Sequence, residues 1–144
     1  MTFSEYRRTL QFDKLSIQEI PLNLIKCQYN FDYERVWLKV CGDYDIKSTP
    51  YYHYLLTGKT DKYFELFRGY GRSEVWITNN IIKFNALVDD IKKNGIKNYP
   101  EVVDKPIVEN RYSKAFEIWE GHRRLSIALF LNIKQKVQLV TLHR

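Results

Sequence analysis

The sequence predicts a single domain of the mixed α/β (α+β) class, in which helices flank one small mixed sheet. Segments with strand-like alternation and segments with helical periodicity follow one another along the chain, as in mixed folds. A length of 144 residues with 44% hydrophobic content is enough for one core without disulfide or metal staples. We therefore treat residues 1–144 as one domain, with residues 33–83 as a helical, Tyr-rich insertion or accessory layer.

Two strands are expected in the first third of the chain. Residues 15–25 alternate well enough for a strand that is followed by a turn at Pro21. Residues 33–41 place three apolar side chains at alternate positions and so predict a second strand.

Three helices are expected in the middle of the chain. Residues 48–50, Ser-Thr-Pro, supply a hydroxyl N-cap and a proline at the first helical position, which predicts a short helix over 51–56. A second short helix is expected over 60–67, ended by Gly69. Residues 84–94 carry apolar side chains at i, i+3, i+4 and i+7 and end at Asn-Gly, which predicts the third helix.

The C-terminal part is expected to combine strands with one buried helix. Short strands are expected over 106–108, 116–119 and 137–142, with a polar loop over 111–115. Residues 123–132 are apolar almost all round a helix, which predicts that this helix is buried.

Composition excludes several classes of protein. No apolar run approaches the roughly 20 residues of a membrane span, and the N-terminal sequence MTFSEYRRTLQF lacks the pattern of a signal peptide. We therefore expect a cytoplasmic protein without a membrane partner. Cys27 and Cys41 form no CxxC pair and only three histidines accompany them, so we expect free thiols and no protein metal site.

The net charge of +6 is concentrated near the C-terminal end. Residues 111–144 carry seven Lys and Arg against two Glu, whereas the first 110 residues have a net charge of only +1. This distribution favours an anionic partner for the C-terminal third, and the alternative is a solvated basic face.

The most informative motif is FEIWEGHRRLSIALFLN, in which a strand and a Glu-Gly turn lead into a helix that opens with two arginines. The first amides of a helix have no internal partners, and the helix dipole attracts negative charge there. Gly121 allows a ligand close to the backbone, and Arg123 and Arg124 offer planar charged donors for phosphate oxygens. This turn is interpreted as a phosphate cradle; the alternative is a structural ion pair of the arginines with Glu120 or Asp89.

The segment EGHRRLSIALFLNIKQKVQLV resembles the signature of the ParB/sulfiredoxin superfamily, a Gly-x-x-Arg turn followed by an alanine-rich helix and a strand. EIPLNLI resembles the opening strand and turn of that family, FNALVDDIKKNGI a later helix and PIVEN the strand after it. The resemblance covers residues 15–26 and 84–142. It implies a nucleotide (ATP, ADP or CTP) with Mg²⁺, its phosphates held by residues at the turn: Gly121, His122, Arg123 and Arg124.

The chain departs from two branches of this superfamily. Sulfiredoxins carry a catalytic cysteine directly after the glycine, where this chain has His122, so reduction of a sulfinic acid is not expected. Chromosome-partitioning members continue into a further nucleotide motif and a DNA-reading helix-turn-helix, which this sequence lacks before Arg144, so a CTP-gated DNA clamp is not expected. Some small-molecule serine kinases share the fold, so the resemblance leaves phosphoryl transfer to a small-molecule acceptor open.

Four side chains are further candidates, each with a plainer interpretation. His122 could contact phosphate or shuttle a proton, or it is a polar turn residue bonded to the backbone. Glu120 could act as a general base or hold a Mg²⁺-bound water, or it pairs with an arginine. Glu19 is an acid candidate by analogy with kinases of the fold, or an exposed strand carboxylate. Arg72 could contact a second phosphate, or it lies in a plain surface loop.

Two classes of function follow. The first is a nucleotide-binding enzyme that hydrolyses a nucleotide or transfers its phosphoryl group. The second is a ParB-like nucleic-acid-binding or nuclease module, which rests on the basic C-terminal third and on tyrosines that could stack bases. A third hypothesis is that the chain is a degenerate member of the fold that serves only in assembly contacts. The oligomeric state stays open.

Overall fold

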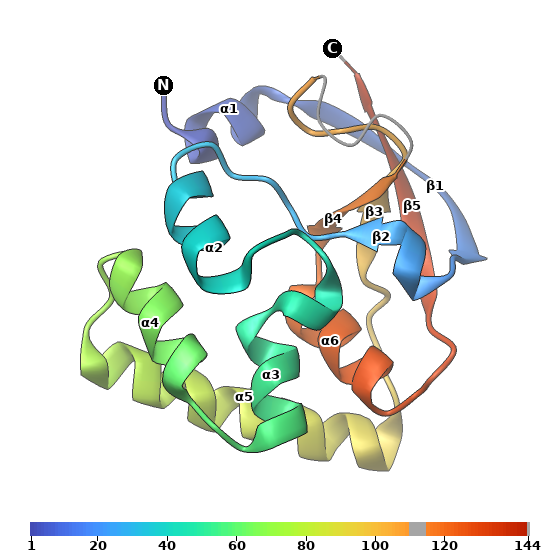
Figure 1. The fold of residues 1–144 in the computed structure, drawn as a ribbon. Helices are drawn as coiled ribbons and strands as arrows, with labels where there is room; N and C mark the ends of the chain where they lie inside the picture. Colours follow the sequence, from blue (N-terminus) through green and yellow to red (C-terminus); the bar gives the residue numbers. More distant parts are fainter. Residues whose placement is uncertain (110–114, 144) are drawn as a thin grey trace.

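The computed structural model describes residues 1–109 and 115–143. In chain order its helices and strands are α1 (Phe3–Thr9), β1 (Gln11–Glu19), β2 (Ile25–Lys26), α2 (Glu34–Cys41), α3 (Pro50–Thr57), α4 (Asp61–Gly69), α5 (Glu74–Asn94), β3 (Glu101–Val103), β4 (Phe116–Glu120), α6 (His122–Phe130) and β5 (Lys136–His143). Two short 3-10 turns, η1 (Leu22–Leu24) and η2 (Ile46–Ser48), precede β2 and α3. The predicted mixed α/β class is confirmed (Figure 1).

The sheet has five strands in the order β1-β5-β3-β4-β2. β5 pairs antiparallel with β1 and parallel with β3. β4 pairs antiparallel with β3 and parallel with β2. The sheet is therefore mixed, with β1 and β2 at its edges. Because β4 is an inner strand, the turn that follows it lies on a well-supported part of the fold.

Both faces of the inner strands are covered, whereas the edge strand β1 is exposed along its whole length. Successive side chains of a strand point to opposite faces, and accordingly Val102 belongs to one buried cluster and Val103 to another. The larger cluster joins the sheet to α2 and α4, and Figure 1 shows α2 to α6 gathered on one side of the sheet. The smaller cluster contains Phe3, so α1 covers part of the opposite face.

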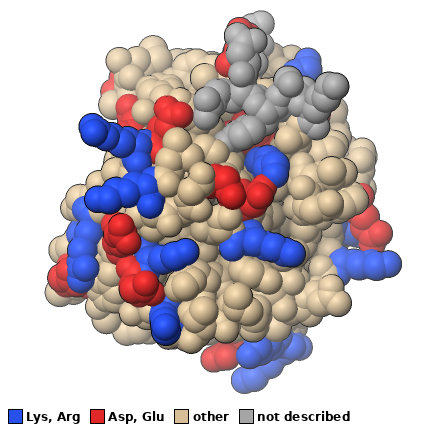
Figure 2. Space-filling view, viewed as in Figure 1, with Lys and Arg blue, Asp and Glu red and all other residues tan. Residues whose placement is uncertain are grey.

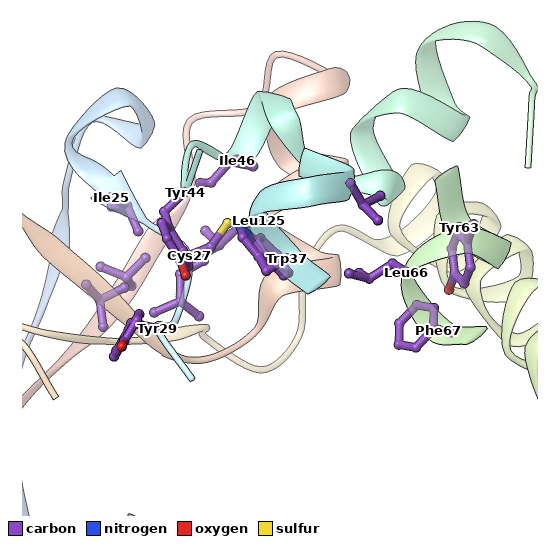
Figure 3. Packing of buried hydrophobic residues seen from close by; sticks show 14 of the residues in the cluster. Ile25, Cys27, Tyr29, Trp37, Tyr44, Ile46, Tyr63, Leu66, Phe67 and Leu125 are labelled. Carbon is purple, nitrogen blue, oxygen red and sulfur yellow. The ribbon is translucent and has the colours of Figure 1, made fainter. Parts of the chain in front are cut away.

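The larger cluster forms a continuous core around Cys27 (Figure 3). The figure shows its sulfur among the side chains of Trp37, Tyr44 and Leu125. Burial raises the pKa of Cys27 well above its usual value, and burial raises the pKa of Cys41 to about 12. Both cysteines are free, as predicted, and both are protonated at neutral pH.

The capping signals of the middle helices are confirmed at α3. The hydroxyl of Thr49 accepts a hydrogen bond from the Tyr52 amide at 3.1 Å, and Pro50 is the first helical residue. Gly58 ends the helix with a left-handed φ of 73°. The second short helix also ends at Gly69, but Thr60 provides no side-chain cap.

Most of the tyrosines of this region are structural. Tyr51 stacks on Phe84 with ring centroids 5.6 Å apart and meets the edge of Tyr63 at 5.4 Å. Tyr63 is fully buried, and its hydroxyl donates to the side-chain carbonyl of Asn80. These rings join α3, α4 and α5 into one layer.

The strand predicted over residues 33–41 is wrong, because these residues form α2. Trp37 and Val40 are buried, whereas Leu38 is 39% exposed. The apolar residues at alternate positions also satisfy the i, i+4 spacing of a helix, here Val36 and Val40, and the helical spacing is the one the fold uses.

The strand predicted over residues 106–108 is also wrong. The Ile107 amide donates at 3.0 Å to the carboxylate of Glu117, so a side chain and not a neighbouring strand satisfies it. β3, at 101–103, was not predicted at all. Most of the loop expected over 111–115 lies outside the described residues.

Two boundaries differ from the sequence predictions. The first strand runs over Gln11–Glu19 and ends before Pro21, and only Ile25–Lys26 returns to the sheet. The helix predicted over 84–94 begins ten residues earlier, because the Ser73 hydroxyl caps α5 by accepting from the Trp76 amide.

Candidate functional site

The turn between β4 and α6 requires a glycine. Gly121 has a φ of 118°, which L side chains rarely adopt, and a Cβ there would lie 2.8 Å from Cβ of Pro100. α6 begins at the next residue and has no side-chain cap. The first amides of the helix are therefore left for another acceptor, as the phosphate interpretation requires.

His122 is held by the loop that follows β2. Its Nε2 accepts a hydrogen bond of 2.9 Å from the backbone amide of Gln28. Burial lowers the pKa of His122 to about 4; Glu120 opposes this shift and Arg7 adds to it. At neutral pH the imidazole is uncharged and carries its proton on Nδ1. This geometry matches the interpretation of His122 as a polar turn residue bonded to the backbone.

Glu120 pairs with an arginine that the sequence analysis did not consider. Its carboxylate lies 2.7 Å from the guanidinium of Arg7, which also donates at 2.7 Å to the Trp119 carbonyl. The same guanidinium lies over the Trp119 ring, 4.0 Å from its centroid. The ion-pair partner of Glu120 is thus Arg7 of α1, and among the described residues neither Arg123 nor Arg124 forms an ion pair with it.

The two arginines of α6 differ in their surroundings. Arg124 donates to the Asn98 carbonyl, and burial lowers its pKa while Glu120 and Glu101 raise it. Arg123 is partly buried, and within residues 1–109 and 115–143 it forms no ion pair or hydrogen bond. Its charge acts on Tyr51, where it opposes the increase in pKa to about 12 that burial causes. The Arg123 guanidinium is therefore a partly buried cation with no partner among the described residues.

A small cavity of about 210 Å³ opens beside His122. Gln28 and Asn30 add polar groups to its wall, and the remaining lining is mostly aromatic. Two of these rings, Tyr33 and Tyr70, stack on one another with centroids 4.2 Å apart. Such walls suit a flat ring, whereas the open helix end beside them suits an anion.

Two predicted site residues lie away from this turn. Glu19 ends β1, opposite Lys136 of β5, and lines a different cavity that also contains Leu129 near the far end of α6. The nine residues of α6 separate the two ends by about 13 Å. Arg72 lies between α4 and α5, with its guanidinium 4.7 Å from the centre of the Trp76 ring. The structure brings Glu120, Gly121, His122, Arg123 and Arg124 together, without Glu19 or Arg72.

Three residues that hold the turn were missed by the sequence analysis. Arg7 and Gln28 both reach the end of β4; the Gln28 amide group donates to the Ile118 and Trp119 carbonyls at 3.1 Å each. Glu117 is fully buried and accepts from the Tyr29 amide at 2.7 Å. Of the three, only Glu117 had a signal in the sequence that could have indicated it, because it is a charged residue within an otherwise apolar strand.

The described residues lack two features that would indicate other kinds of site. In the described part of the chain, no group of three or more His, Cys, Asp or Glu side chains could hold a metal ion. No helix in that same part is long and apolar enough to cross a membrane. On the face drawn in Figure 2, Lys and Arg are interspersed with Asp and Glu. This view therefore shows no continuous basic patch.

Neither family models nor curated proteins nor solved structures give a significant match to this chain.

Proposed function

We propose that this chain binds a nucleotide at the turn between β4 and α6, in the manner that its resemblance to the ParB/sulfiredoxin superfamily implies. The phosphates bind the first amides of α6 and the guanidinium of Arg123. The observation that carries the proposal is Arg123 itself, a partly buried cation without a described protein partner beside an uncapped helix N-terminus.

The aromatic cavity beside His122 accommodates the base or the sugar in this proposal. Its volume of about 210 Å³ is below the range of about 300–1000 Å³ typical of pockets that enclose a whole ligand. Only part of a nucleotide is enclosed, and the phosphates lie outside the cavity along α6. Mg²⁺ arrives with the phosphates, since the described residues supply no metal cluster of their own.

Binding is better supported than catalysis by the groups at the turn. His122 is uncharged at neutral pH and its Nε2 already accepts from Gln28, so this nitrogen neither gives nor takes a proton. The Glu120 carboxylate is paired with Arg7. Arg123 could stabilise charge on a transferred phosphoryl group. Hydrolysis or transfer then needs a base from outside these two residues.

Calorimetric titration with ATP, ADP, CTP and GTP, with and without Mg²⁺, tests the proposal. We expect saturable binding that Arg123→Ala weakens at least tenfold, about 1.4 kcal/mol. Lys93→Ala is the control, because it removes one positive charge at an exposed position of α5 that does not line the aromatic cavity. Absence of binding by the folded wild-type protein, or equal losses in the two variants, would contradict the proposal.

A further inference from the structure

A second cavity lies apart from the one beside His122, and it is the larger of the two. It has a volume of about 650 Å³ and lies between the end of β1, η1, β2, η2 and the C-terminal end of α6. It shares no lining residue with the aromatic cavity. We call it the β2–α6 cavity.

The inner part of the β2–α6 cavity is apolar. Ile20, Ile25 and Ile46 line it and are 6%, 1% and 3% exposed, so they are fixed in the core. Leu129 and Ile133 contribute further apolar wall from α6 and the segment after it. Because the walls come from several packed elements, the cavity is preformed, and its volume falls in the range of about 300–1000 Å³ of small-molecule sites.

The rim of the cavity carries an excess of available positive charge. Lys26 is paired with Asp45, so these two charges offset one another. Lys47 and Lys134 also line the cavity, are exposed, and form no ion pair with any residue of the described ranges. Glu19, the remaining acid of the lining, faces Lys136 across the β1–β5 ladder.

Gln135 adds a buried polar group to the lining. Its side chain is 8% exposed, and its amide nitrogen donates to the Lys136 carbonyl at 2.6 Å. That bond fixes the direction of the amide and leaves its oxygen as an acceptor. A fixed polar group in a mostly apolar wall is typical of sites that orient a ligand.

We propose that the β2–α6 cavity binds a small amphipathic molecule with an apolar body and one anionic group, such as a carboxylate or sulfonate. The apolar body lies against the three isoleucines. The anionic group lies at the rim, between Lys47 and Lys134. The charge of the rim distinguishes this ligand class from cationic and from uncharged apolar molecules.

Fluorescence titration with 8-anilinonaphthalene-1-sulfonate, which has an apolar body and one sulfonate, tests the proposal. We expect saturable binding to the folded protein, and a dissociation constant at least tenfold higher in the double variant Lys47→Gln, Lys134→Gln. Both lysines are exposed, so this variant should keep the wild-type melting midpoint. Lys59→Gln, Lys105→Gln is the matched control, because these lysines are exposed and do not line the cavity.

Two further measurements test where the dye binds and which class of ligand the cavity prefers. Ile133→Trp fills the cavity and should abolish binding of the dye, whereas Arg123→Ala should leave it unchanged, so the result is independent of nucleotide binding. Dodecanoate should displace the dye at a concentration at least tenfold lower than dodecan-1-ol. Unchanged affinity in both the lysine double variant and Ile133→Trp would overturn the proposal, as would equal displacement by the alcohol. Displacement by phosphatidylglycerol vesicles at low lipid concentration would also overturn it, in favour of a membrane lipid.

Discussion

The Nε2 atom of His122 accepts a hydrogen bond of 2.9 Å from the backbone amide of Gln28, a residue 94 positions earlier in the chain. This bond links the start of α6 to the loop after β2. It requires an unprotonated Nε2, so it ties the geometry of the turn to the uncharged state of the imidazole.

Stability should depend on pH through His122. Burial lowers its pKa in the folded chain from 6.5 to about 4, so the unfolded chain binds a proton more readily. The stability contributed by the uncharged imidazole is complete above pH 6.5 and decreases as the pH falls towards 4, by at most about 1.4 kcal/mol per pH unit. Urea denaturation at pH 7.5, 6, 5 and 4.5 measures this decrease.

The variant His122→Asn should have a lower stability at pH 7.5 and a flatter dependence on pH than the wild type. His143→Asn is the control, because this histidine lies on the exposed end of β5 beside Asp13. A slope that does not differ between His122→Asn and the wild type would show that His122 is not the titrating group.

The substitution Gly121→Ala should destabilise the fold more than Gly95→Ala. Both glycines have a positive φ, which costs an alanine about 1–2 kcal/mol. At Gly95 the new methyl group meets nothing within 4 Å, but at Gly121 it lies 2.8 Å from Cβ of Pro100. Thermal and urea denaturation of both variants measure the difference, and equal losses would contradict the close approach of Pro100.

Removal of the Glu117 carboxylate should be among the most destabilising changes in the sheet. Its two oxygens accept from the Tyr29 amide at 2.7 Å and the Ile107 amide at 3.0 Å. Glu117→Leu leaves both buried amides without this acceptor, at about 1–3 kcal/mol each. Glu117→Gln keeps one acceptor oxygen and should lose less. Urea denaturation ranks the two variants, and a Gln variant as unstable as the Leu variant would contradict this account.

The N-cap of α3 should contribute measurably to stability. The Thr49 hydroxyl accepts from the Tyr52 amide and donates to the Ile46 carbonyl at 2.8 Å, and the residue is fully buried. Thr49→Val keeps the shape of the side chain and removes these two bonds together with the 3.3 Å contact to the Ser126 hydroxyl, at a cost of about 1–2 kcal/mol. Ser73→Ala, at the exposed cap of α5, should cost less. Loss of the same stability in both variants would argue against the buried network at Thr49.

The parts of the fold that local signals determine were the parts that the sequence predicted well. β4, α6 and β5 follow from a strand, a glycine turn and an apolar helix within one continuous segment. The caps of α3 follow from the Ser-Thr-Pro and Gly signals at its ends. α2 was assigned to the wrong class because residues 36 and 40 fit both a strand and a helix, and only packing of Trp37 and Val40 into the core distinguishes the two.

The candidate site was predicted only in part, because local signals indicate the turn but not the distant residues that hold it. The turn residues lie next to one another in the sequence, so their types and order indicate a phosphate cradle. Arg7 and Gln28 lie 112 and 91 residues from the Trp119 carbonyl that they share. No spacing within the sequence relates residues so far apart, and only the folding of α1 and the β2 loop onto β4 brings them to the turn.

Amide resonances of the α6 turn give the most direct test of nucleotide binding at this site. In ¹⁵N-labelled protein, Mg²⁺ with ATP should shift the backbone resonances of His122, Arg123 and Arg124 and the side-chain Nε resonance of Arg123, saturably and with one dissociation constant. The resonances of Lys47 and Lys134 should stay in place. Shifts confined to the β2–α6 cavity, or a turn that does not respond to ATP, ADP, CTP or GTP, would contradict the phosphate site.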